Sequence, residues 1–301
     1  MLAAVGICLL AGAVARTPSG DPLRAAAEYI ASRQYERAAE MLEKVIRLPQ
    51  APPDAFLMLV DCRMRRGEFE AALAAARAGL EKHPDSPLLL ITAGRLLLRD
   101  RQLSASARDL LAKAAQLEPG NPETHYYYSQ WACLHNQEDL CIREAEAALK
   151  LSGDNPQAEL QLNALIGIAA EKLDRPAEAE AAYKRSLAAN RKLGLADPLS
   201  AYRYVDFLVK RARDDEAESL VDDLIRRAPR FGPAQLERAK FLAKKGEQQQ
   251  ALALAEKSLT MEDMDKDAQR AAHMLLARIY FLLGREDDAA RHQAWIEQNP
   301  H

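Results

Sequence analysis

The architecture of this chain is clearest in one segment, LDRPAEAEAAYKRSL at residues 173–187. The turn former Asp174 lies near its start, alanine recurs through it, and a single aromatic residue follows the alanines. Small side chains at this density allow two helices to approach closely where they cross. Related segments recur along the chain, which indicates an internal repeat.

Ala179 anchors a periodic pattern. A small residue occupies the equivalent position in eight segments, at Ala38, Ala72, Ala107, Cys141, Ala179, Ala217, Ala251 and Ala289. The intervals are 34, 35, 34, 38, 38, 34 and 38 residues. Turn formers lie five residues before five of the anchors, at Gly67, Asn136, Asp174, Gly246 and Gly284. This periodicity predicts stacked units, none of which buries its apolar face alone.

Each unit is predicted to be a helix, a tight turn and a second helix. Helix starts are marked by a polar cap before proline, at Asp21-Pro22, Ser86-Pro87, Asn121-Pro122, Asn155-Pro156 and Asp197-Pro198. Helix ends are marked by Pro84, Pro119 and Pro229, twelve residues after an anchor. Aromatic residues make up only 6% of the chain, and helix-favouring Ala and Leu dominate, which predicts an all-α fold.

Two irregularities modify the pattern. Arg95 stands where the first helix needs a small residue, with Gly94 beside it, so we expect a one-residue shift in that unit. The three 38-residue intervals add about one helical turn each, which we place near residues 156–159, 189–197 and 260–266.

The 34-residue spacing, the small residue in the first helix, the turn GEFEAA at residues 67–72 and the closing proline resemble tetratricopeptide repeats. About eight such repeats would cover residues 21–299. The resemblance implies a right-handed α-α superhelix, or solenoid, whose first helices line a concave groove. It also implies a non-enzymatic scaffold that binds a protein or peptide in that groove.

The family pattern implies which side chains line the groove. They are Tyr126, Gln130, Tyr202, Asp206, Lys210, Lys240 and Lys244. Tyrosine offers apolar area and a hydroxyl group, and the lysines offer charge for an acidic segment of a partner. The alternative is that the lysines only form a solvated face. Tyr128 and Trp131 fall at positions that face the core in this family, and Tyr126 and Tyr127 could simply cover the neighbouring helix.

Residues 1–15, MLAAVGICLLAGAVA, contain no charge and end in small residues, which predicts a secretory signal followed by a linker at residues 16–20. No basic residue precedes Leu2, so the alternative is an uncleaved apolar helix packed on the first repeat. The first reading predicts a bacterial periplasmic or secreted protein, and the second a cytoplasmic adaptor. A self-associating structural component of an envelope assembly is a further alternative.

The net charge of −3 gives no electrostatic footprint for nucleic acid, and we expect no membrane insertion of the mature chain. No catalytic motif with its supporting residues is present, so we expect neither an enzyme nor a cofactor. His125, Cys133, His135 and Cys141 lie within seventeen residues, but on helices they point apart, and no metal site is expected. The segment DMDKD at residues 263–267 lacks the glycine and glutamate of a calcium loop and is interpreted as a helix cap.

Cys133 and Cys141 flank the turn of one predicted hairpin. A disulfide between them is sterically plausible in an oxidising compartment. The alternative is that both are small core residues. Removal of the signal would leave three cysteines, so at least one has no partner within the chain.

Overall fold

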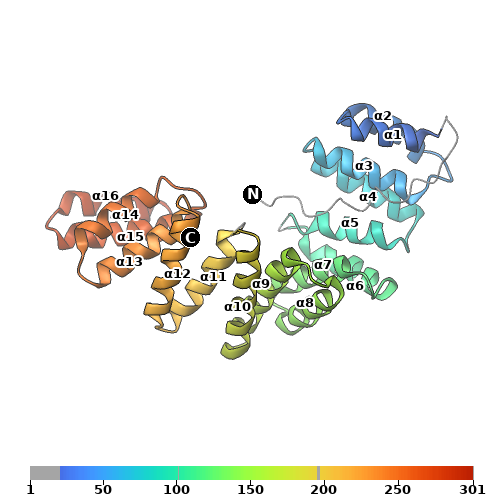
Figure 1. Cartoon of the computed structure of the whole chain (residues 1–301). Helices are drawn as coiled ribbons and strands as arrows, with labels where there is room; N and C mark the ends of the chain where they lie inside the picture. The colour runs from blue at the N-terminus through green and yellow to red at the C-terminus, as the bar shows by residue number, and fades with distance from the viewer. Residues whose placement is uncertain (1–20, 101, 195–196, 301) are drawn as a thin grey trace. The chain divides into compact units, whose positions relative to one another are not determined.

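The computed structural model describes residues 21–300 except 101, 195 and 196. Within these residues, sixteen α-helices and one short 3₁₀ turn follow one another (Figure 1). The described residues form no strand beyond an isolated bridge between Phe231 and Glu262. The predicted all-α fold is confirmed. The predicted signal and linker, residues 1–20, lie outside the described residues.

The chain divides after Asn136 into two compact units. The first contains α1 (Pro22–Ala31), α2 (Tyr35–Ile46), α3 (Pro53–Arg65), α4 (Phe69–Lys82), α5 (Pro87–Leu97), η1 (Ser104–Ser106), α6 (Ala107–Leu117) and α7 (Pro122–Leu134). The second contains α8 (Glu138–Ser152), α9 (Pro156–Lys172), α10 (Pro176–Lys192), α11 (Pro198–Lys210), α12 (Asp214–Arg227), α13 (Gly232–Lys244), α14 (Gln248–Ser258), α15 (Lys266–Leu282) and α16 (Glu286–Gln298). Within each unit every helix packs on the next one in sequence, and several first helices also touch the first helix of the following hairpin.

The turns between paired helices share one backbone conformation. The residue five places before the anchor has a positive φ in seven of the eight repeats, at Arg33, Gly67, Asn136, Asp174, Ala212, Gly246 and Gly284. In the α9–α10 turn the amide of Asp174 donates to the carbonyl of Glu171, and the amide of Arg175 donates to that of Ala170. A residue in the left-handed backbone conformation, with backbone hydrogen bonds of this kind to the last carbonyls of the helix, ends that helix and reverses the chain direction. Arg33 and Ala212 adopt this conformation although their residue types gave no signal.

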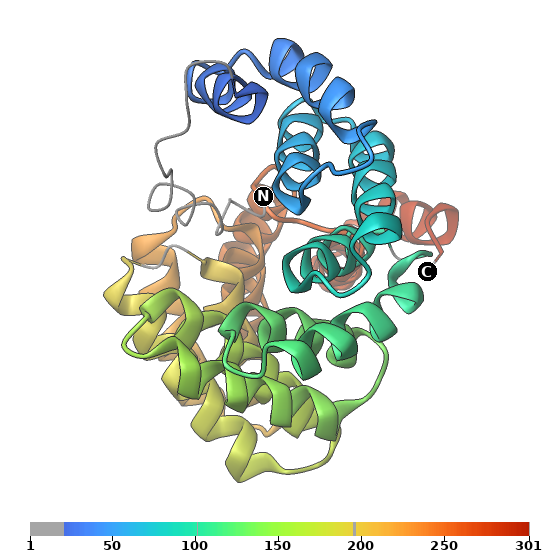
Figure 2. The same cartoon turned by 90° about the vertical axis from the view of Figure 1, so that its right-hand side faces the viewer.

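Small residues lie where paired helices cross. α9 and α10 lie side by side in both views (Figure 1 and Figure 2), and Gly167 of α9 faces Tyr183 of α10. A Cβ at Gly167 would come within 2.6 Å of the Tyr183 ring. In α5 the close approach occurs at Gly94, where a Cβ would lie 2.6 Å from Leu111. Gly94 therefore takes the small-residue position and leaves Arg95 beside it, which is the predicted one-residue shift.

The helix starts agree with the predicted caps. The side chains of Asp21, Asn121, Asn155 and Asp197 each accept a hydrogen bond from an amide in the first helical turn. Ser86 occupies the cap position of α5 without such a bond. Asp265 of the DMDKD segment accepts from the amide of Ala268 and so caps α15, as interpreted from the sequence.

The added residues lengthen helices. α9, α10 and α15 each contain 17 residues, whereas the other first helices of the second unit, α11 and α13, contain 13. α9 begins at Pro156 and α10 ends at Lys192, so two of the three predicted positions of an extra turn coincide with helix extensions. At the third position, residues 260–265 lie in the connection between α14 and α15, and α15 begins only at Lys266. None of the described helices combines the length and apolar character that a membrane span requires.

Candidate protein-binding surface

The first helices of the second unit, α9, α11 and α13, present polar side chains to one another. The hydroxyl of Tyr202 on α11 donates to the Glu237 carboxylate on α13 over 3.1 Å. Lys240 donates to the same carboxylate oxygen over 2.8 Å. Glu237 is only 4% exposed, so its charge needs both donors. These contacts fix the orientation of Tyr202 and Lys240.

A second carboxylate of this kind lies two repeats earlier. Glu171 on α9 accepts from Lys210 on α11 over 2.9 Å and from the buried Tyr183 on α10 over 3.0 Å. Lys210 also pairs with Asp206 at 2.7 Å, four residues earlier on its own helix. Tyrosine and lysine thus converge on a glutamate of α9 and on a glutamate of α13. We call the surface formed by Glu171, Tyr202, Asp206, Lys210, Glu237, Lys240 and Lys244 the first-helix face of the second unit.

The surface around Tyr202 and the three predicted lysines therefore carries charges of both signs. Lys244 pairs with Asp214 of α12, so each of the three lysines named from the sequence has a carboxylate partner. Lys210 and Lys244 remain exposed, and Asp206 is exposed beside them. An acidic ligand would have to compete with these internal carboxylates. A ligand that presents both charges and apolar groups fits the surface better.

The two tyrosines predicted to line the groove are neutral phenols. Burial raises the pKa of Tyr202, and the neighbouring Glu237 raises it further. Burial also raises the pKa of Tyr126. Each ring is partly covered, and its hydroxyl already takes part in a hydrogen bond within the protein. These tyrosines offer ring edges to a ligand more than free hydroxyl groups.

In the first unit, Tyr126 and Gln130 lie one helical turn apart on α7. The Gln130 amide donates to the Tyr126 hydroxyl over 2.7 Å. Tyr126 also packs edge-on against Tyr127, with ring centroids 5.1 Å apart. The two side chains named from the sequence are thus in contact, and the Tyr126 hydroxyl has a hydrogen-bond partner within the protein. Their role in binding stays a prediction.

The core assignment within α7 was partly wrong. Trp131 is buried as expected, and its indole N–H donates to the carbonyl of Ser104 over 3.0 Å. Tyr128, expected in the core, is half-buried, whereas Tyr127 is buried. Thr124, Tyr127, Tyr128 and Trp131 all fit one helical face by their spacing, so periodicity alone does not distinguish Tyr127 from Tyr128.

The cysteines differ in state. Cys62 is free and buried, and burial raises its pKa to about 11. Cys133 and Cys141 are each disulfide-bonded in the structure. Their pairing with each other under cellular conditions stays a prediction. Among the described residues no cluster of three or more His, Cys, Asp or Glu side chains is arranged to hold a metal ion.

Sequence reasoning missed a histidine cluster in the last hairpin. Nδ1 of His273 on α15 lies 2.9 Å from Nδ1 of His292 on α16. Trp295 stacks on His273 at 3.9 Å between ring centroids, and Tyr280 stacks on His292 at 5.5 Å. The two histidines lie on opposite sides of the Gly284 turn. Alignment of the two antiparallel helices about that turn would have indicated that the two histidines lie close together.

Comparison with known proteins agrees with this geometry. A family model described as a tetratricopeptide repeat matches residues 29–96. These residues carry tetratricopeptide repeats. The hairpin stack outside the matched residues carries the same repeat. A search of curated proteins finds no match to this tetratricopeptide-repeat sequence.

Solved structures share the fold at low sequence identity. A tetratricopeptide repeat protein from Parabacteroides merdae has a TM-score of 0.62 at 13% identity, over 85% of this chain and 97% of that one. The C-terminal part of a repeat-containing protein from Cytophaga hutchinsonii has a TM-score of 0.58 at 13% identity, over 83% and 98%. The pilF protein of Pseudomonas aeruginosa has a TM-score of 0.57 at 18% identity, over 72% and 95%. These likenesses confirm the solenoid fold.

Proposed function

We propose that this tetratricopeptide-repeat protein is a non-enzymatic scaffold that binds a protein or peptide on its first helices. The tetratricopeptide fold is typical of protein-interaction scaffolds, and proteins with this fold are generally non-catalytic. The observation that carries the proposal is the first-helix face of the second unit. It combines the partly buried Tyr202 with exposed charges of both signs on α11 and α13, the first helices of two successive repeats.

Such a surface suits a peptide or a helix of another protein. The carboxylates of Glu171 and Glu237 hold Lys210 and Lys240 in place, so the binding groups are ordered before a partner arrives. Ordered groups lose less conformational entropy when a complex forms. Exposed Asp206 and Lys244 are placed to pair with a partner's charges, and such pairs favour selectivity more than affinity.

Binding is tested by affinity capture from a cell-envelope extract with two triple variants. Asp206→Ala/Lys210→Ala/Lys244→Ala removes exposed charges of the first-helix face. Glu146→Ala/Lys150→Ala/Arg226→Ala removes one negative and two positive exposed charges from second helices of the same unit and is the matched control. We expect the first variant to lose a captured protein that the control retains. Retention by both variants, each folded by circular dichroism, contradicts the proposed surface.

We also propose that the protein is exported, because residues 1–15 have the composition of a cleavable signal. Intact mass of the protein expressed with its own N-terminus tests this, and we expect loss of the first fifteen residues. A full-length mass in the envelope fraction contradicts cleavage. Thiol titration of denatured, unreduced protein tests the accompanying disulfide, and three free thiols per mature chain would rule it out.

A further inference from the structure

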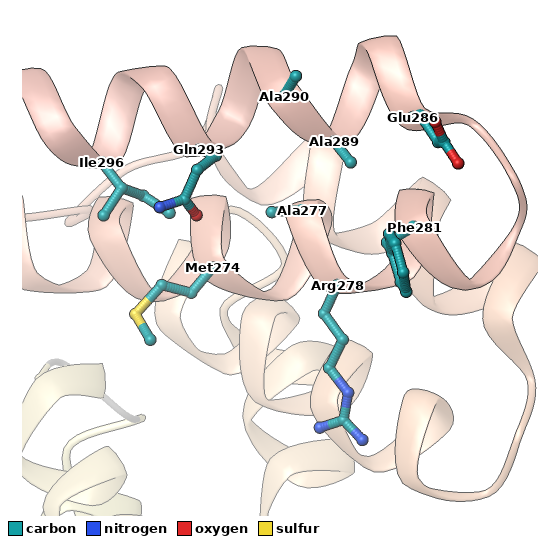
Figure 3. Close-up of a pocket in the computed structure, with 9 residues that line it drawn as sticks. All are labelled: Met274, Ala277, Arg278, Phe281, Glu286, Ala289, Ala290, Gln293 and Ile296. Atoms are coloured by element: carbon teal, nitrogen blue, oxygen red, sulfur yellow. The ribbon is translucent and has the colours of Figure 1, made fainter.

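The last hairpin, α15–α16, leaves an apolar face open to solvent. Met274 is 56% exposed and Phe281 is 68% exposed, although both are large apolar residues on one helix. Figure 3 shows Met274, Arg278 and Phe281 on the same side of α15, with Ala289, Gln293 and Ile296 on α16 beside them. The two helices enclose an open cleft of about 610 Å³ between these side chains.

The repeat shows what normally covers this face. A shift of 38 residues superimposes the last hairpin on α13–α14, and it places Met274 at Leu236 and Ala290 at Leu252. Leu236 is 2% exposed and Leu252 is 6% exposed. α15, the next first helix, packs there on both α13 and α14, and Leu252 lies in one buried cluster with Leu276 of α15. The open face of the last hairpin is thus the interface that the preceding hairpin buries under a helix.

The residues that fill the earlier interface define the pattern of such a helix. Leu276, Ile279 and Tyr280 of α15 lie in one buried cluster with Leu242 and Leu252. These three residues occupy positions i, i+3 and i+4 of α15, so they form a single apolar stripe along one side of the helix. On the open face the small residues Ala277, Ala289 and Ala290 leave room for bulky side chains of this kind.

Among the described residues, the first helix of the array, α1, shows no matching surface. On α1, Arg24 and Glu28 form an exposed ion pair one turn apart, so the outer side of that helix is polar. Polar outer faces are what terminal repeats need for solubility. A second copy of the chain therefore has no apolar first helix to place on the open face by continuing the stack.

We propose that this face, which we call the terminal seat (Met274, Ala277, Phe281, Ala289, Ala290 and Ile296), binds an amphipathic helix of a partner protein. The helix docks as the first helix of a further repeat would, with an apolar stripe like that of α15. Arg278 lies between Met274 and Phe281 and forms no ion pair with any described residue. A carboxylate next to the apolar stripe of the partner helix therefore pairs with the Arg278 guanidinium. This site is separate from the first-helix face, and either can exist without the other.

The test uses a fluorescently labelled peptide with the sequence of residues 265–284, because α15 carries the stripe that fills the equivalent interface. Its binding to the full chain is followed by fluorescence anisotropy. We expect saturable binding that weakens at least tenfold for both Phe281→Asp and Met274→Asp. Leu134→Asp is the matched control, since Leu134 is 61% exposed near the end of α7, and it should bind the peptide as the unaltered chain does.

Several results would overturn the proposal. No saturable binding, or equal weakening by Leu134→Asp, removes the terminal seat as the binding site. Sedimentation that shows a dimer of the unaltered chain, dissociated by Phe281→Asp, would make a second copy the occupant instead. Because Phe281 and Met274 are exposed, the variants should retain the fold, and circular dichroism checks this.

Discussion

At the scale of single residues, close helix crossings depend on the absence of a side chain. Tyr183 is fixed opposite Gly167 by burial, by stacking on Tyr204 at 6.2 Å and by its hydrogen bond to Glu171. The ring therefore has little freedom to move away from an added methyl group. This explains why a glycine, costly in a helix, stands in the middle of α9.

We expect Gly167→Ala to destabilise the protein although alanine favours helix. Overpacking a rigid site costs roughly 1–3 kcal/mol, and the better helix propensity of alanine returns about 1 kcal/mol. The net loss should be roughly 1 kcal/mol by urea denaturation. Gly120→Ala is the control, since a Cβ there meets no atom within 4 Å. Equal stability of the two variants would show that the crossing is loosely packed.

Glu180 gives a prediction about acid. Hydrogen bonds from Arg213 and then Lys184 lower the pKa of Glu180 to about 2. A lowered carboxylate pKa stabilises the fold above its ordinary value of 4.5, and this contribution is lost as the pH falls from 4.5 towards 2. Glu180→Gln should thus reduce stability at pH 7, with a difference from the unaltered chain that shrinks below pH 4.5. Exposed Glu146→Gln is the control, and an equal effect there would contradict the assignment.

At the scale of elements, the last hairpin is held by its ring cluster as well as by helix packing. The short Nδ1–Nδ1 contact between His273 and His292 needs one nitrogen to donate and the other to accept. Two imidazolium rings cannot make that bond. Burial lowers the pKa of both histidines, and the His292 charge lowers that of His273 further.

We therefore expect acid to loosen α15–α16. A histidine whose pKa is lowered by folding stabilises the fold above pH 6.5 and loses that contribution as the pH falls below it. Glu256 and Asp288 border the cluster and favour the charged form, whereas Arg291 opposes it. Hydrogen exchange should show less protection in α15–α16 at pH 5.5 than at pH 7.5, relative to α11, after correction for intrinsic exchange. In the His292→Phe variant, this loss of protection at pH 5.5 should be smaller. Identical protection of α15–α16 at both pH values in the unaltered chain would contradict the prediction.

Local signals accounted for most helices, and long-range partners were harder to predict. Caps such as Asn155 and turn residues such as Gly246 act within a few residues, so sequence alone located them. The partners on the first-helix face are far apart in sequence, as Lys210 and Glu171 are, so their pairing was not predicted. Ala212 shows a further limit, since packing imposed a positive φ on a residue type that seldom adopts it.

At the scale of the whole molecule, both units are built from contacts between neighbours. Every substantial helix–helix contact joins successive helices or the first helices of adjacent repeats. In such arrays stability is close to a sum over repeats and their interfaces. A scaffold of this type offers a series of similar surfaces, and the side chains on the first helices distinguish one repeat from another.

The central claim, that a partner binds on the first helices, is tested most directly by site-specific photo-crosslinking in a cell-envelope extract. A benzophenone amino acid replaces Asp206 or Lys244 on the first-helix face, and Lys184 or Arg226 on second helices of the same unit. We predict that positions 206 and 244 crosslink one protein and that positions 184 and 226 do not. Crosslinking of the same protein only from positions 184 and 226 would contradict the account.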